Sequence, residues 1–88
     1  MSEVTIEFYG VPRQRAGRAE LAVEADSART ALVRIAEACP GLGPLLGPGG
    51  ELLPQYRLAI DAERFLIDLS EPLSAGTRLL LMSADAGG

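Results

Sequence analysis

Alternation of apolar and polar residues marks the first part of the chain. Residues 3–9 place an apolar side chain at every second position, which is the period of a half-buried strand. Residues 19–25 alternate in the same way, so we expect the two segments to form a hairpin. The intervening residues 13–18 are basic and contain a glycine, which predicts a turn. The positions expected to face the core are Val4, Ile6, Phe8, Leu21 and Val23.

A helical period follows. Asp26 or Ser27 offers an N-cap, and apolar residues then recur at helical spacing from Ala28 to Cys39. Pro40-Gly41 predicts the end of this helix. The residues expected on its buried face are Ala28, Leu32, Ile35, Ala36 and Cys39, which makes Cys39 an inert core thiol in this interpretation.

The second half of the chain predicts a loop and three more strands. Residues 41–54 hold five glycines and three prolines, and we expect Leu42, Leu45 and Leu46 to attach this loop to the core. Strands are predicted at residues 56–61, 64–69 and 77–83. The apolar residues of these strands are Leu58 and Ile60 in the first, Phe65 and Ile67 in the second, and Leu79 and Leu81, facing inward, in the third.

The predicted order is therefore β-β-α-β-β-β, an α+β pattern with one helix across one face of a sheet. The first and last strands are apolar and are the natural centre of that sheet. This arrangement is the β-grasp, or ubiquitin-like, fold, a mixed sheet of four to five strands with one main helix. We assign residues 1–83 to this domain and residues 84–88 to a flexible C-terminal tail.

The amino-acid composition argues against most kinds of catalytic site. The 88 residues include no His and no Lys, and all eight basic residues are Arg. Without His and with one Cys, we expect no metal site of the common zinc or iron–sulfur types. A Ser-His-Asp triad and a Lys Schiff base are excluded as well, so the inventory argues against an enzyme in its own right.

Charge and hydropathy restrict the partners. The net charge of −4 disfavours nucleic acid, which attracts basic surfaces. The longest aliphatic run, residues 79–82, is too short to span a bilayer, and the first residues do not form a signal peptide. One Cys cannot form an internal disulfide. We therefore expect a cytoplasmic protein without a membrane partner.

The sequence ends in Gly87-Gly88, a short spacer after the last predicted strand. Together with the opening strand at residues 4–9, the helix end at residues 37–42 and the stretch Glu71-Pro72-Leu73-Ser74-Ala75-Gly76-Thr77, this ending resembles the ThiS/MoaD family of β-grasp sulfur carriers. The resemblance covers nearly the whole chain. The chain is longer than typical carriers of the thiazole branch, and its length is closer to that of the small subunit of molybdopterin synthase. Three positions depart from the family pattern: Thr77, Ser83-Ala84, and Asp61-Ala62 in place of a frequent Asn-Gly turn.

The resemblance implies that Gly88 is the reactive group. In that family a ubiquitin-activating-like adenylyltransferase uses ATP to adenylate the C-terminal carboxylate, and a persulfide sulfur then displaces AMP. The resulting thiocarboxylate donates sulfur to a precursor held by a synthase. The synthase that the resemblance favours here is the molybdopterin synthase large subunit. No cofactor is expected on the chain itself, since ATP is used by the partner. Gly87 supplies a residue without a side chain, which lets such a tail enter a narrow channel.

Strand alternation also predicts a partner surface. If Leu79 and Leu81 point inward, Leu80 and Met82 point to the other face of the sheet, with Thr5 and Glu7 opposite. The residues expected to form a partner-binding face are Leu80, Met82, Arg57, Ala59 and, more weakly, Phe65. The alternatives are that the 41–54 loop covers this face, or that Leu80 and Met82 are scattered exposed apolar residues without a partner.

Two other functions stay open. The chain could be a ubiquitin-like modifier conjugated through Gly88 to target lysines; without Lys it cannot accept a lysine-linked copy of itself. It could also be a non-covalent β-grasp binding module in which Gly87-Gly88 is incidental. Deleting Gly87-Gly88 separates the third function from the other two, because the binding module keeps its activity.

Overall fold

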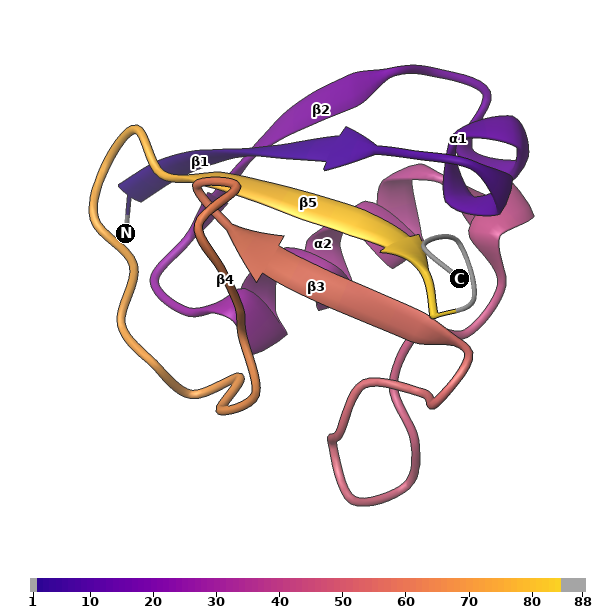
Figure 1. Ribbon diagram of the computed structural model, residues 1–88. Coiled ribbons are helices and arrows are strands. Elements are labelled where there is room, and N and C mark those ends of the chain that lie inside the picture. Colours follow the sequence, from indigo (N-terminus) through magenta and orange to yellow (C-terminus); the bar gives the residue numbers. More distant parts are fainter. Residues whose placement is uncertain (1, 85–88) are drawn as a thin grey trace.

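The computed structural model describes residues 2–84 and shows one mixed sheet with a helix packed across one face (Figure 1). The predicted β-grasp fold is confirmed. The strand order is β2-β1-β5-β3-β4. Within residues 2–84, no helix has the length and apolar character needed to cross a bilayer. The elements are β1 (Ser2–Phe8), α1 (Val11–Ala16), β2 (Glu20–Ala25), α2 (Ala28–Ala38), the 3₁₀ helix η1 (Pro40–Leu42), β3 (Tyr56–Ile60), β4 (Arg64–Phe65) and β5 (Arg78–Ser83).

β1 and β5 form the centre of the sheet, as the sequence predicts, and they pair in parallel. Ile6 lies opposite Leu79 and Phe8 lies opposite Leu81 in this pair. β1 also pairs antiparallel with β2, and β5 pairs antiparallel with β3. The two strands richest in inward apolar residues are thus flanked on both sides, which removes them from water.

Helix α2 covers the inner face of this sheet. Ser27 is its N-cap: the Ser27 Oγ accepts a hydrogen bond of 3.3 Å from the Thr30 N–H. The helix ends at Ala38, before the proline of η1. The residues that fill the space between α2 and the sheet are Val4, Ile6, Phe8, Ala28, Ala31, Leu32, Ile35, Cys39, Leu58, Leu79 and Leu81.

The segment predicted as a turn at residues 13–18 is instead mostly helical. α1 runs from Val11 to Ala16, with Pro12 in its first turn and buried. Gly17 ends it with a left-handed φ of 75°, and its N–H donates to the Arg13 carbonyl at 3.1 Å. The prediction was wrong because six residues carry too little periodicity to read, and burial of Pro12 and Ala16 against neighbouring elements stabilises the helix.

The strand predicted at residues 64–69 is shorter than expected. Only Arg64 and Phe65 pair with β3. The buried residues that follow are Leu66 and Leu69, whereas Ile67 is 92% exposed. The alternation inferred from Phe65 and Ile67 therefore does not continue beyond β4, because the chain leaves the sheet to bury the two leucines.

The 41–54 loop lies on the helix side of the molecule. Leu42 and Leu45 are buried and Leu46 is partly buried, as predicted. The Arg29 Nε on α2 donates to the Gly50 carbonyl at 3.2 Å. The loop is thus held against α2, and the outer face of the sheet is not covered by it.

Candidate functional site

The outer face of the sheet carries the residues that alternate with the core positions. The strand registers place Glu20, Glu7, Leu80, Ala59 and Phe65 in one row across all five strands. Because both central strands bury their other face under α2, every second residue of β1 and β5 must point outward here. The row is acidic over β2 and β1 and apolar over β5, β3 and β4.

A shallow hollow occupies the apolar half of this face. Its volume is about 250 Å³, and its lining residues are Ala59, Ala62, Glu63, Arg64, Phe65, Leu80 and Met82. Phe65 is 53% exposed, whereas its cross-strand partner Ala59 is only 7% exposed. An exposed aromatic beside half-buried aliphatic residues has the composition of a binding surface.

The structure brings together all five residues predicted for a partner face. Leu80, Met82, Ala59 and Phe65 line the hollow, and Arg57 lies beside it with its guanidinium carbon 5.3 Å from the centre of the Phe65 ring. That distance is a cation–π contact. Sequence reasoning missed Ala62, Glu63 and Arg64, which enter through the β3–β4 turn. Their only signal was the turn itself, and a turn does not indicate which face it will line.

Arg57 also contacts the start of the C-terminal segment. Its Nε donates to the Ala84 carbonyl at 3.3 Å, and the Ala84 N–H donates to the Gln55 carbonyl at 2.8 Å. One side chain thus joins the hollow to the point where the chain leaves β5. Gly87 and Gly88, the predicted reactive residues, lie outside the described residues.

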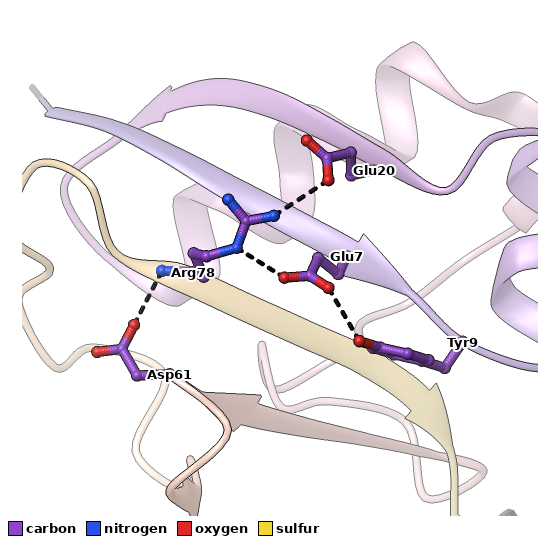
Figure 2. A network of polar contacts seen from close by, with 5 residues as sticks. All are labelled: Glu7, Tyr9, Glu20, Asp61 and Arg78. Carbon is purple, nitrogen blue, oxygen red and sulfur yellow. Dashed lines mark hydrogen bonds and ion pairs between the residues drawn. The ribbon is translucent and has the colours of Figure 1, made fainter.

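A polar network occupies the acidic half (Figure 2). The Arg78 guanidinium lies between two carboxylates: its Nε donates to Glu7 at 2.6 Å and its Nη2 to Glu20 at 3.0 Å. The Tyr9 hydroxyl donates to the second Glu7 oxygen at 2.9 Å, and the Arg78 N–H donates to Asp61 Oδ1 at 3.1 Å. The network ties four strands or their ends together across the outer face.

The network shifts the acidity of its members. The Arg78 guanidinium, and then the Tyr9 hydroxyl, hold the pKa of Glu7 below its usual value. The hydrogen bond to the Glu7 carboxylate raises the pKa of Tyr9, because the phenol must stay protonated to donate it. Glu7 is therefore an ionised anchor for Arg78 and not a carboxyl group prepared to release or accept protons near neutrality.

Other chemistry is scarce in the described chain. Residues 2–84 contain no group of three or more His, Cys, Asp or Glu side chains able to hold a metal ion. Cys39 is 4% exposed among apolar residues, so its predicted burial is confirmed. The described residues thus form an apolar hollow close to Ala84, and among them no constellation of catalytic groups is present.

This architecture defines the class: the chain has the β-grasp, ubiquitin-like fold. Solved structures share it over nearly the full length. Small archaeal modifier protein 1 from Haloferax volcanii is 23% identical with a TM-score of 0.82, covering 99% of this chain and 100% of that one. The protein of the same name from Methanosarcina acetivorans is 20% identical with a TM-score of 0.84, covering 100% and 98%.

A third solved structure also shares the fold. It is a protein from Pyrococcus furiosus assigned as molybdopterin converting factor, subunit 1, which is 17% identical with a TM-score of 0.76 and covers 94% of this chain and 98% of that one. The sequence matches no protein-family model and no curated protein. The likeness at these identities establishes the fold, and it confirms the predicted resemblance to ThiS/MoaD-type β-grasp proteins in architecture.

Proposed function

We propose that this protein is a sulfur carrier whose Gly88 carboxylate is converted to a thiocarboxylate. The observation that carries the proposal is the Gly87-Gly88 pair, which begins four residues after Ser83, the last residue of the central strand β5. A carboxylate must be activated before sulfur can replace oxygen, and it must also reach another protein's active site. Two residues without side chains can pass through a narrow channel that leads to such an active site.

The chemistry would be supplied by partners. The Gly88 carboxylate attacks the α-phosphorus of ATP on an adenylyltransferase, and pyrophosphate leaves. A persulfide attacks the acyl carbon and releases AMP, and a thiol then cleaves the acyl disulfide to free the thiocarboxylate. A chain without His or Lys is compatible with this division of labour, since the activating enzyme and the sulfur acceptor hold the catalytic groups.

The same surface would serve both partners. The hollow lined by Leu80, Met82 and Phe65 lies beside Arg57, which holds the carbonyl of Ala84. A protein docked on this hollow is therefore positioned next to the origin of the segment that leads to Gly88. The architecture shared with the molybdopterin converting factor supports a synthase large subunit as the acceptor.

Mass spectrometry of the C-terminal peptide tests the proposal. Trypsin cleaves after Arg78, the last basic residue, and releases residues 79–88. The chain is incubated with an adenylyltransferase proven active on a related carrier, with ATP and a persulfide donor. Fragment ions that place sulfur at Gly88 are expected, and an unmodified Gly88 contradicts the proposal.

The released peptide also contains Met82, whose oxidation adds nearly the same mass as oxygen-to-sulfur exchange. Met82→Leu is the matched control, because it keeps an apolar side chain on the outer face and removes the sulfoxide. Alkylation of the thiocarboxylate provides a second distinction. Loss of the mass increase in Met82→Leu, together with no alkylated product from the unsubstituted chain, shows oxidation instead of sulfur transfer.

A ubiquitin-like modifier is the second candidate function. The observation in its favour is that two of the solved structures described above are small archaeal modifier proteins. Conjugation joins Gly88 to a lysine of another protein, so peptides from the host proteome should carry residues 79–88 on lysine. A chain lacking Gly87-Gly88 is the control. Sulfur at Gly88 without such peptides favours the carrier alone.

A further inference from the structure

A basic segment lies outside the functions argued so far. Between Val11 and Ala19 the sequence holds Arg13, Arg15 and Arg18 and no acidic residue, although the whole chain carries a net charge of −4. Three of the eight basic residues therefore fall in nine positions. Such a concentration on an otherwise acidic protein creates a local positive field.

The guanidinium groups of two of these arginines have no partner among the described residues. Within residues 2–84, the side chains of Arg13 and Arg18 are exposed and make no hydrogen bond or ion pair. The acidic residue nearest to Arg18 in sequence is Glu20, whose carboxylate is already bound by Arg78 at 3.0 Å. Arg15 differs, because its Nη1 donates to the Tyr56 hydroxyl at 3.3 Å.

Arg13 and Arg18 line the same hollow. Its volume is about 560 Å³, and it is bordered by Gly10, Arg13, Gln14, Gly17, Arg18 and Ala19. Two of the six lining residues are glycines, so another polypeptide could approach the backbone closely. The hollow is wide and open and contains no buried polar side chain, which fits pairing with carboxylates on a protein surface better than enclosure of a small anion.

The position of this hollow relates it to the C-terminal segment. β1 and β5 run parallel, and α1 follows β1 directly, so α1 lies at the end of the sheet where β5 ends (Figure 1). The Tyr9 N–H donates to the Leu81 carbonyl at 3.0 Å, and Tyr56, the acceptor for Arg15, pairs with Ser83. Four residues beyond Ala84 reach at most about 14 Å. A protein that receives Gly88 therefore faces α1.

From these observations we infer that Arg13 and Arg18 form an electrostatic docking site for a carboxylate-rich surface on the adenylyltransferase that receives Gly88. The inference rests on the proposed function for the identity of that partner. The site is separate from the apolar hollow around Phe65, since the two share no lining residue. Charge pairs of this exposed kind act mainly on the association rate and make it dependent on salt.

Nuclear magnetic resonance with an octaglutamate peptide tests the site without any activating enzyme. The peptide is expected to shift the amide signals of Gly10 and Gly17, and octaglutamine is not. The double variant Arg13→Glu, Arg18→Glu should bind octaglutamate at least tenfold more weakly. About 1 M salt, where the Debye length is ~3 Å, should abolish binding to the wild-type chain.

The control is Arg29→Glu, Arg34→Glu, which changes the net charge equally but alters α2. Equal weakening in both double variants shows a general charge effect and overturns the inference. Shifts produced by inorganic phosphate but not by octaglutamate overturn the ligand class. The milder variant Arg13→Gln, Arg18→Gln should also lose binding, and a thermal melt of each variant verifies folding.

The experiments distinguish failure of the docking inference from failure of the proposed carrier function. If wild-type chain gains sulfur at Gly88 and the Arg13→Glu, Arg18→Glu variant gains it at the same rate at low salt, the docking inference is wrong and the carrier function stands. If the wild-type chain gains no sulfur, the carrier function is wrong, and octaglutamate binding still decides the basic site.

Discussion

The turn between β3 and β4 contains two non-glycine residues with left-handed backbone. Asp61 has a φ of 52° and Ala62 a φ of 58°. At Asp61 the cost of this backbone conformation is offset by two hydrogen bonds. The Asp61 N–H donates to the Arg78 carbonyl at 2.8 Å, and the Asp61 carboxylate accepts from the Arg78 N–H at 3.1 Å. Ala62 has only an exposed methyl group. Ala62→Gly should therefore stabilise the fold.

The magnitude follows from two opposing terms. A left-handed conformation costs an L-residue roughly 1–2 kcal/mol, which glycine does not incur. Glycine loses more conformational entropy on folding, about 0.5–1 kcal/mol relative to alanine. The net gain in the free energy of unfolding is about 0.5–1 kcal/mol. For 88 residues at ~2.1 cal/mol/K each, the melting temperature should rise by about 3–5 °C.

Thermal unfolding followed by circular dichroism measures this change, with Ala22→Gly as the matched control. Ala22 is exposed on β2, an extended strand, so the same substitution there should lower stability by about 0.5–1 kcal/mol. Opposite signs for the two variants are the expected result. If Ala62→Gly lowers the melting temperature as Ala22→Gly does, the argument from backbone strain is refuted.

Further substitutions test the partner face, the core and the polar network. Phe65→Ala should slow thiocarboxylation at limiting enzyme at least tenfold, as expected for an aromatic anchor of a docking surface, whereas Ile67→Ala, equally apolar but outside the hollow, should not; equal rates refute the docking role. Leu79→Ala should lower the urea-derived free energy of unfolding by about 2–5 kcal/mol, because the side chain is fully buried between the sheet and α2, and a loss below 1 kcal/mol contradicts that packing. Glu7→Gln should cost about 0.2–1 kcal/mol at neutral pH, since the lowered pKa of Glu7 stabilises the fold above its usual value of 4.5. That difference should vanish as the pH falls through the folded-state pKa of Glu7, and a difference independent of pH and salt argues against the ion pair.

Sequence alone sufficed where a long segment repeats one period. The alternation in β1 and β5 and the helical spacing in α2 each place several apolar residues on one side, and burying that side requires these elements. The central position of β1 and β5 was predicted correctly for this reason. Their parallel pairing, and the choice of Ser27 over Asp26 as N-cap, came from the structure. The outward direction of Leu80, Met82, Arg57 and Ala59 follows from the same alternation, so much of the candidate surface could be predicted.

Short segments were decided by tertiary contacts. The six residues of α1 are too few to show a repeated period, and they are helical because Pro12 is buried and Ala16 packs against the core. Around the end of β4, the chain can bury either Phe65 and Ile67 or the leucines Leu66 and Leu69. Leu66 and Leu69 are inside because the chain bends back toward the core there, a choice that the local pattern leaves open.

Interactions between distant residues also needed the fold. Arg78 joins Glu7 and Glu20 across 71 and 58 residues of sequence, because the parallel and antiparallel registers bring β5, β1 and β2 side by side. The same registers set Arg57 against Phe65 and Ala84, and place the Arg13 and Arg18 hollow at the end of β5. The sequence determined the apolar faces, the helix and the Gly87-Gly88 ending, since these depend on local period and residue type. Strand order and register, which depend on how the whole core closes, determined which side chains meet.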